Sequence, residues 1–355
     1  MKPINQIQIE NALREGCRTY VFSGCQLAFA TGAIEKSFSF GQASYWKGSR
    51  PVEEDTYFDL GSLTKVVFTT SVFARLVEQK RVDVNTPVED FIPAFKKTRY
   101  STITLKQLLT HSSGLVSWNA FYLEKTTDLI EVFLKNERSF LPERSEVNCV
   151  YSDLGFLLLG EVLRLVFGDF KSLFQTEVMS PLRLKEIKFG PLPPEKCAAT
   201  EFCLERRKLL QGQVFDHNTD FLGGVCSHAG LFSSAKSLLP WAKEWLKAVQ
   251  GASSWLSPEV AREFIRGGQE IGDSTWALGW DTKSKAFSSA GDFFSNESFG
   301  HLGFPGTSIW IDPINSGVVV LLTNRVHPSR LDERIKRFRP MIHNLIAESW
   351  ESHGS

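Results

Sequence analysis

The 355-residue sequence has no excess of either charge, since its 40 basic side chains balance 40 acidic ones. This balance argues against a nucleic-acid partner, because proteins that bind nucleic acids usually carry a basic surplus. Long hydrophobic runs are missing as well. The longest run, 154–160, stops at Glu161 and is far below the roughly 18 residues that indicate a transmembrane helix. We therefore expect no membrane span.

Cysteine is scarce, and its spacing shows no recognisable pattern. The six cysteines include no Cys-x-x-Cys pair, so the sequence predicts neither a zinc knuckle nor a redox pair. Free thiols in a reducing compartment are the expected state. Residues 1–17 also lack the apolar core of a secretory signal. Both absences favour a cytoplasmic protein. A periplasmic or secreted protein, whose leader has been removed, is the alternative.

The motifs of several enzyme classes are absent. The chain contains no GxSxG, GxxxxGK[ST], GxGxxG or HExxH pattern. The nearest approach to the first, residues 306–310, ends in Trp310 rather than glycine, which excludes the α/β-hydrolase interpretation. The seven histidines are spread along the chain without the spacing of metal ligands. We therefore expect neither a metal nor another cofactor.

What is present is a change of hydrophobic period along the chain. A short amphipathic helix is predicted over 5–15, and alternating stretches at 26–29 and 37–40 predict a β-hairpin. From Leu63 onward the apolar residues follow a helical period instead. A last helix is predicted over 340–350.

The order of these segments predicts one α/β domain. Residues 83–205 are mostly helical and rich in loops, whereas strands return near 308–311 and 318–323. We therefore expect an α/β platform, built from 1–82 and 206–355, with an inserted helical lobe between its two parts.

Helix-capping patterns mark three helix starts in this lobe. Residues 86–89 (Thr-Pro-Val-Glu) combine a cap, a proline at the first helical position and a glutamate for a capping box. Thr104 and Gln107 form a second capping box. Ser152 or Asp153 can cap the strongly apolar helix that follows.

The pattern that could carry chemistry is Ser-x-x-Lys, because a serine and a lysine three residues apart share a face on a helix. The chain holds three copies, at Ser44/Lys47, Ser62/Lys65 and Ser233/Lys236. Ser44 leads into a stretch that cannot be helical, and Ser233 or Ser234 is explained as a helix cap. Ser62 stands at the start of a long amphipathic helix, where the helix field acts on its hydroxyl. An ordinary N-cap serine is the alternative.

Two downstream segments support a catalytic Ser62. A lysine can act as a base only when its surroundings lower its pKa toward neutrality. Residues 149–153 (Cys-Val-Tyr-Ser-Asp) place Tyr151 on a capped turn before an apolar helix, and 299–307 (Phe-Gly-His-Leu-Gly-Phe-Pro-Gly-Thr) lead into a strand. The glycines of that strand, Gly303 among them, would let a substrate backbone approach closely.

The Ser62/Lys65 pair, residues 149–153 and residues 299–307 follow one another in this order. With these three elements, the chain resembles the serine β-lactamase and penicillin-binding-protein family. It is most similar to the class C-related esterases and D-amino-acid peptidases. Residues 103–115, 223–233 and 310–313 extend the resemblance over nearly the whole chain. The resemblance implies a β-lactamase-like fold: an antiparallel sheet flanked by helices, with an inserted, mainly helical lobe.

The resemblance also implies roles for individual residues. Ser62 would be the nucleophile that forms an acyl-enzyme. Lys65 would keep Ser62 activated, Tyr151 would relay a proton to the leaving group, and either of them could be the formal base. The backbone N–H groups of Ser62 and Phe304 would form the oxyanion hole.

Two positions, Asp153 and His301, depart from the family pattern. Both are expected to contact the substrate, as is Gly303. Asp153 stands where the family usually has asparagine. It would accept hydrogen bonds only, and it could instead pair with Lys65 or cap the helix. His301 stands where lysine is usual and would supply far less positive charge at pH 7.

These departures weaken the case for efficient β-lactam turnover. We expect a serine hydrolase acting on a D-amino-acid-containing peptide or a carboxylic ester. A β-lactamase, or a penicillin-binding sensor that acylates without efficient turnover, is the alternative. The partner is a small molecule or short peptide, and the oligomeric state stays open.

Three other histidines are interpreted as structural: His111, His228 and His327, each expected to anchor a loop through its ring. Trp118 and Phe304 are candidates for contact with substrate.

Overall fold

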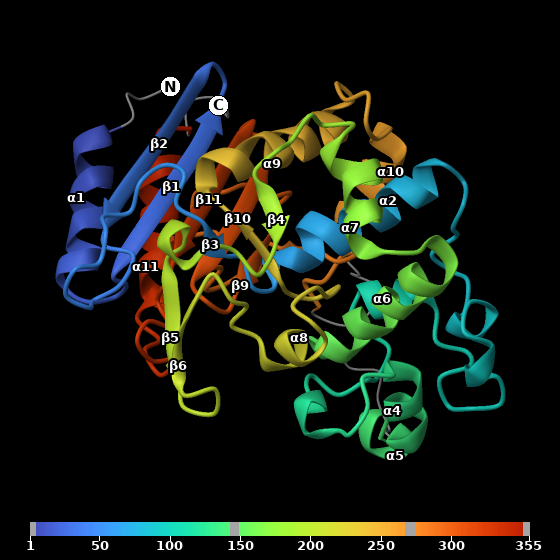
Figure 1. Ribbon diagram of the computed structural model, residues 1–355. Helices are drawn as coiled ribbons and strands as arrows, with labels where there is room; N and C mark the ends of the chain where they lie inside the picture. Colours follow the sequence, from blue (N-terminus) through green and yellow to red (C-terminus); the bar gives the residue numbers. More distant parts are fainter. Residues whose placement is uncertain (1–4, 143–148, 267–273, 351–355) are drawn as a thin grey trace.

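A computed structural model describes residues 5–142, 149–266 and 274–350. Its central sheet has six strands in the order β2-β1-β11-β10-β9-β8, and every neighbouring pair is antiparallel (Figure 1). The strands are β1 (Gly24–Thr31), β2 (Ile34–Gly41), β8 (Asp281–Thr282), β9 (Phe299–Gly303), β10 (Thr307–Asp312) and β11 (Gly317–Thr323). β1 lies between β2 and β11, so the two ends of the chain meet inside one sheet.

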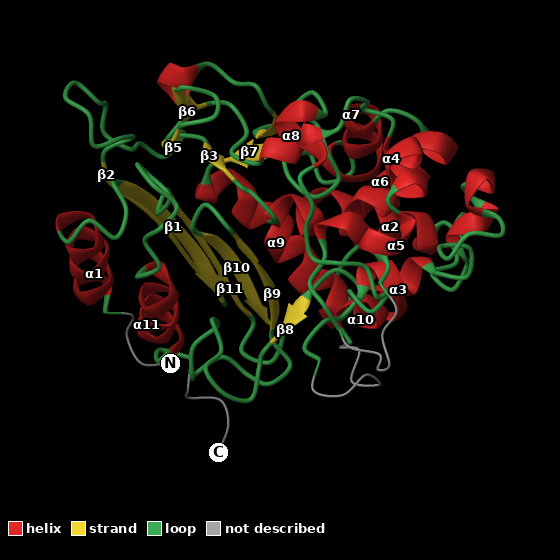
Figure 2. Cartoon of the chain, turned by 90° about the horizontal axis from the view of Figure 1, so that it is seen from below, coloured by secondary structure: helices red, strands yellow, loops and turns green. Residues whose placement is uncertain are grey.

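Helices cover both faces of this sheet. α1 (Gln6–Arg18) and α11 (Ile335–Ala347) lie on one face, and α9 (Ala235–Gln250) lies on the other, next to the helical part of the molecule (Figure 2). Side chains such as Leu13 and Ile342 bury the first face. The second face belongs to a larger core that runs on into the helical part, because strand and helix residues pack in one continuous cluster. This shared core fixes the sheet against the helices that carry the catalytic candidates.

The remaining elements surround the junction between sheet and helices. Near Ser62, a π-helical turn η1 (Lys65–Thr70) runs directly into α2 (Ser71–Glu78). The other helices are α3 (Leu105–Leu109), α4 (Leu129–Lys135), α5 (Glu137–Phe140), α6 (Asp153–Phe167), α7 (Phe170–Phe174), α8 (His217–Phe221) and α10 (Pro258–Ile265), with a second π-helical turn, η5 (Gln175–Met179). Short 3-10 turns are η2 (Val88–Asp90), η3 (Pro93–Phe95), η4 (Phe121–Leu123) and η6 (Pro194–Lys196). Two small sheets hold β3 (Phe58–Asp59), β7 (Leu231–Ser233) and β4 (Ile187–Phe189), and β5 (Ala199–Cys203) with β6 (Lys208–Gln211).

Most local predictions are confirmed. The α/β class and the first hairpin are present, the Thr104–Gln107 capping box forms both of its hydrogen bonds, and the Ser152 side chain caps α6. All six cysteines are free. Among the described residues, no helix is long and apolar enough to cross a membrane. The division into a platform and a lobe at residues 83–205 stays a prediction.

Two predictions were wrong. No regular helix follows residues 86–89, where only the short η2 turn forms without a side-chain cap. The backbone there pairs with a neighbouring segment instead, since the Val88 N–H donates to the Ile103 carbonyl and Leu105 to that of Thr86. Tertiary pairing has overridden the local capping signal. The last helix begins at Ile335, before the predicted start at residue 340.

Candidate active site

Ser62 lies on a tight corner between β3 and the helical turn that leads into η1. Gly61 adopts a left-handed conformation with φ of 52°, which a residue with a side chain rarely takes. Asp59 holds this corner, accepting a hydrogen bond from the Gly61 N–H at 2.8 Å and another from the Phe215 N–H at 2.7 Å. Burial raises the pKa of Asp59 to about 6. The corner leaves Ser62 partly exposed to a cavity while its neighbours are buried.

Lys65 is fully buried one turn further along. Its Nζ donates to Ser62 Oγ at 3.0 Å and to Asp153 Oδ1 at 2.6 Å. Burial alone would lower the pKa of Lys65, but the charges of Asp153 and Tyr151 and hydrogen bonds to both raise it above its ordinary value. Lys65 is therefore an ammonium ion in this state, and it cannot accept the Ser62 proton until it has lost one of its own.

Tyr151 lies against the same ammonium group, with its ring centre 4.8 Å from Lys65 Nζ. Burial raises the pKa of the Tyr151 hydroxyl, while the charge of Lys65 and hydrogen bonds with Lys65 and Ser62 oppose that rise. His111 positions this segment: its Nδ1 accepts the Ser152 N–H at 3.0 Å, and its ring lies 4.7 Å from that of Tyr151. The structural role predicted for His111 agrees with these contacts.

Of the two protein contacts considered for Asp153, the structure shows the ion pair with Lys65 and not the helix cap. Ser152, one residue earlier, is the cap of α6, because its side chain accepts the Gly155 N–H at 3.2 Å. The carboxylate of Asp153 forms the ion pair with Lys65 instead. A substrate amide would have to share this carboxylate with Lys65.

The two backbone segments expected to supply the oxyanion-hole N–H groups lie next to each other. Within the described residues, neither the Ser62 nor the Phe304 N–H donates to another protein group. A Cβ added to Gly61 would lie 3.4 Å from the Phe304 nitrogen, so the serine corner and the turn after β9 are adjacent. Arg325 Nε donates to the Phe304 carbonyl at 2.9 Å and fixes the plane of that peptide group.

His301 is buried beside this site, with only 1% of its surface exposed. Its Nδ1 donates to the Leu302 carbonyl at 2.8 Å, which leaves Nε2 as an acceptor without a partner among the described residues. Burial and the charge of Lys65 lower the pKa of His301 to about 3. His301 therefore supplies no positive charge at neutral pH. Its ring borders the cavity, while Nε2 itself is buried.

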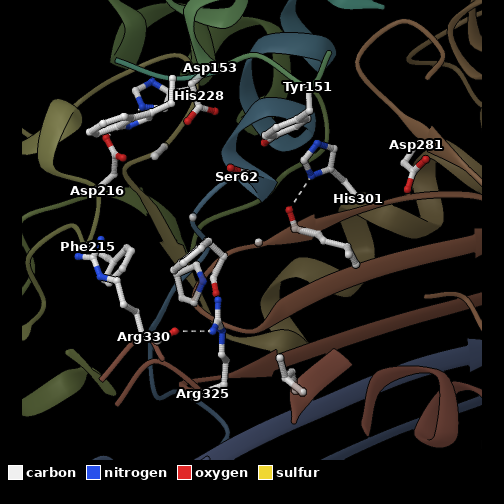
Figure 3. Close-up of a pocket in the computed structure, with 18 of the residues that line it drawn as sticks. Ser62, Tyr151, Asp153, Phe215, Asp216, His228, Asp281, His301, Arg325 and Arg330 are labelled. Atoms are coloured by element: carbon white, nitrogen blue, oxygen red, sulfur yellow. Dashed lines mark hydrogen bonds and ion pairs between the residues drawn. The ribbon is translucent and has the colours of Figure 1, made fainter. Parts of the chain in front are cut away.

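One cavity of about 530 Å³ is lined by residues described above, among them Ser62, Tyr151, Asp153, His301, Phe304 and Arg325. Figure 3 shows Tyr151 and His301 beside Ser62, and Arg325 and Arg330 on another side of the cavity. Much of the wall is aromatic, formed by Trp118, Phe215, Trp276 and Phe304. Both aromatic residues proposed from sequence, Trp118 and Phe304, are about half exposed there, at 46% and 51%.

Residues 12–339 match the Beta-lactamase family. The chain belongs to the beta-lactamase family. It is 30% identical to an N-acetylmuramyl-L-alanine amidase of Bacillus subtilis, over 85% of this chain and 76% of that protein. It is 29% identical to a Salmonella gallinarum protein named as a D-alanyl-D-alanine carboxypeptidase, over 81% of this chain and 75% of that protein.

Solved structures of the beta-lactamase fold superimpose on nearly the whole chain. EstCE1, described as a hydrolase with promiscuous acyltransferase activity, has a TM-score of 0.75 at 18% identity, covering 96% of this chain and 98% of its own. A class C beta-lactamase from Rhodobacter sphaeroides has a TM-score of 0.68 at 18% identity, with the same coverage of both chains. The protein is thus a serine hydrolase of the beta-lactamase family.

Sequence reasoning missed two arginines of this beta-lactamase-family site. Arg325 and Arg339 line the cavity and are largely buried, at 8% and 5% exposure. Arg339 donates to the carbonyls of Gly303 and Thr307, both at 3.1 Å. No motif marks these arginines, because they reach the cavity from just after β11 and from α11, through tertiary packing alone.

Gly303 has a packing reason to be glycine in this family member. A Cβ there would lie 1.9 Å from Thr307 Oγ1 and 2.4 Å from the Leu60 carbonyl oxygen, which accepts the Thr307 hydroxyl at 2.9 Å. Gly303→Ala is therefore expected to push β9 away from the Ser62 corner. We expect it to lower the free energy of unfolding by about 1–3 kcal/mol and to reduce kcat, measured by denaturant titration and with an ester substrate.

Gly155→Ala is the matched control. An added Cβ in α6 meets nothing nearer than 3.5 Å, and alanine favours a helix over glycine by up to about 1 kcal/mol. If both variants had the same free energy of unfolding and the same kcat, the packing role of Gly303 would be excluded.

Proposed function

We propose that this serine hydrolase removes a C-terminal D-amino acid from a short peptide through an acyl-enzyme on Ser62. The observation that carries the proposal is the contact of the Lys65 ammonium with Ser62 Oγ, 3.0 Å long, at the edge of a cavity. Arg325 and Arg339 line this cavity, and neither has a carboxylate partner among the described residues. The names of the amidase and carboxypeptidase relatives support the same substrate class.

Ser62, Lys65 and Tyr151 would act as one titrating unit. Lys65 and Tyr151 together must first lose one proton. Ser62 Oγ then attacks the carbonyl carbon of the scissile amide, and the Ser62 proton passes to that pair. Tyr151, in contact with both other members, would then return that proton to the departing amine. Lys65 would stabilise negative charge on the Ser62 or the Tyr151 oxygen. The apparent pKa of activity would therefore belong to the whole unit rather than to a single residue.

The developing oxyanion would lie between the N–H groups of Ser62 and Phe304. Each such donor contributes roughly 3 kcal/mol to stabilising the transition state. Arg339 would act as a positioning residue, because it holds the Gly303 carbonyl, which belongs to the same peptide group as the Phe304 N–H. Arg325 holds the Phe304 carbonyl, one peptide group further along. Asp153 and the neutral His301 would accept hydrogen bonds from the substrate's amide groups, with Gly303 allowing close approach of its backbone.

A carboxylate at the end of the substrate fits the positive side of the cavity. Within the part of the chain that the structure describes, Arg325 donates only to backbone carbonyls, those of Phe304, Arg330 and Asp332. Arg339 also donates to carbonyls, and its Nε has no partner among the described residues. Neither guanidinium forms an ion pair with a described carboxylate, so their positive charge is available to an anionic substrate.

A pair of peptides tests this proposal. An acetylated peptide ending in D-Ala-D-Ala is expected to be cleaved with a kcat/KM about 10-fold or more above that of its C-terminal amide, since a charge-assisted hydrogen bond contributes about 1.5–3 kcal/mol. The peptide ending in L-Ala-L-Ala is the stereochemical control. Cleavage of nitrophenyl esters without any cleavage of the D-peptide would contradict the proposal.

Hydrolysis of carboxylic esters is the second candidate function. The aromatic wall of Trp118, Phe215 and Phe304 favours it, because an apolar acyl group would be buried there without an ionic partner. The likeness of the fold to EstCE1 is compatible with this activity. In the same assay, a higher kcat/KM for long-chain than for short-chain esters, with no peptide cleavage, would favour it.

A further inference from the structure

A cluster of metal-binding side chains lies next to the active-site cavity, outside the catalytic unit. Glu201 and Cys203 stand on β5, Glu205 follows in the hairpin turn, and His217 is the first residue of α8. The ligand atoms of Glu201, Cys203 and His217 lie within 4.8 Å of one another. Cys203 and Glu201 are nearly inaccessible, at 1% and 6% exposure.

Three of the distances within this cluster are close to those of a tetrahedral zinc site. Cys203 Sγ lies 3.4 Å from His217 Nε2 and 3.4 Å from Glu205 Oε2, and those two atoms are 3.7 Å apart. Zinc binds sulfur at about 2.3 Å and nitrogen or oxygen at about 2.0–2.1 Å, which separates tetrahedral ligands by about 3.3–3.6 Å. The three side chains thus surround a point that one ion could occupy with small adjustments.

We propose that Cys203, Glu205 and His217 bind a zinc ion, with Glu201 as the fourth ligand. The charges balance when the site is filled. A thiolate and two carboxylates carry three negative charges, whereas zinc and the Arg330 guanidinium, which pairs with Glu201, carry three positive ones. On binding, the Cys203 thiol releases its proton to solvent, so affinity falls as the pH is lowered.

The surroundings of the cluster support its ligands. The Arg206 N–H donates to Cys203 Sγ at 3.4 Å, a contact that stabilises a thiolate. Burial, with the charges of Arg206 and Arg330, lowers the pKa of His217, which keeps its ring neutral and able to coordinate. Burial raises the pKa of the Cys203 thiol, so the metal would have to drive its deprotonation.

The proposed site would stabilise one wall of the cavity. His217 lines that cavity, and Arg330, the partner of Glu201, lines it as well. A bound zinc ion would tie the β5–β6 hairpin to α8 and fix both residues. Its role would be structural, because the catalytic unit of Ser62, Lys65 and Tyr151 does not include these residues.

Cobalt binding tests the proposal without reference to activity. The full-length protein, reduced and stripped of metal, is titrated with Co²⁺ and then with Zn²⁺. We expect one equivalent to bind, with intense visible bands of tetrahedral cobalt and a thiolate-to-cobalt charge-transfer band, and zinc to displace it. Cys203→Ser should abolish the charge-transfer band and weaken zinc binding by about 100-fold or more, since even outer-shell partners contribute about 10–100-fold.

Cys17→Ser and Glu195→Gln are the matched controls, because both residues lie outside the cluster and should leave the spectrum unchanged. Glu205→Gln should keep the thiolate band and weaken binding, which guards against a Cys203→Ser variant that does not fold. An octahedral cobalt spectrum, no thiolate band in the wild-type protein, or equal zinc affinity of wild type and Cys203→Ser would overturn the proposal.

Discussion

Replacing Ser62 with alanine is expected to lower kcat for a nitrophenyl ester by about 10,000-fold or more, because the loss of a nucleophile removes the contribution of the whole catalytic unit. The Lys65 ammonium would then lose its contact with Ser62 Oγ and keep the one with Asp153. Intact mass spectrometry gives a second readout. After exposure to an activated ester or a penicillin, the wild-type protein should gain the mass of one acyl group, and Ser62→Ala should gain none.

Ser44→Ala is the control for this experiment. Ser44 belongs to another Ser-x-x-Lys copy and lines a different cavity from Ser62. Its hydroxyl accepts the Trp46 N–H at 3.2 Å. This variant should keep wild-type kcat and the wild-type adduct. Residual activity of Ser62→Ala within tenfold of the wild type would exclude Ser62 as the nucleophile.

Asp153→Asn is expected to move the acidic limb of the kcat/KM profile to lower pH by about one unit or more, because an opposite charge in direct contact shifts a titration by at least that much. The sign follows from the ion pair of 2.6 Å with Lys65. The negative charge of Asp153 favours the protonated form of the catalytic unit, and activity requires that the unit lose a proton. Asparagine removes the charge, so the active form is reached at lower pH.

Asp216→Asn is the matched control, since Asp216 lines the same cavity but pairs with His228 at 3.0 Å rather than with Lys65. Asparagine can also keep its role as the cap of α8. The acidic limb of the kcat/KM profile of Asp216→Asn should stay at the wild-type pH. If both variants moved the limb equally, the effect would be a general one of charge in the cavity and not a property of the Lys65 pair.

The catalytic candidates could be predicted because their chemistry constrains local sequence. A serine and a lysine that share one turn must be three or four residues apart, and Ser62 and Lys65 do meet, at 3.0 Å. The ion pair of Asp153 could be named only as one of several possibilities. Its partner lies 88 residues away in sequence, and only the packing of α6 against η1 brings the two together.

The electrostatic character of His301 shows what sequence could not supply. Its identity predicts a pKa near 6.5, but complete burial and the neighbouring ammonium lower the pKa to about 3. The cationic side of the cavity likewise depends on Arg325 and Arg339, which no motif marks. His228 is expected to fix a loop through a bond to the backbone, but its ring contacts the Asp216 carboxylate at 3.0 Å instead, and the residue also lines the cavity.

The antiparallel pairing of β1 with β11 sets an order for biosynthesis. Gln26 pairs with Leu322, and the carbonyl of Gly303 is held by Arg339 on α11, so the last tenth of the chain completes the catalytic cleft. A ribosome adds about 5–20 residues per second, which leaves the β1–β2 hairpin without its neighbour for roughly 15–60 s. During that interval the edge of β1 is open to other nascent chains. Activity should therefore appear only once β11 and α11 have been synthesised and have packed against β1, and chaperones that shield strand edges should raise the yield of active protein.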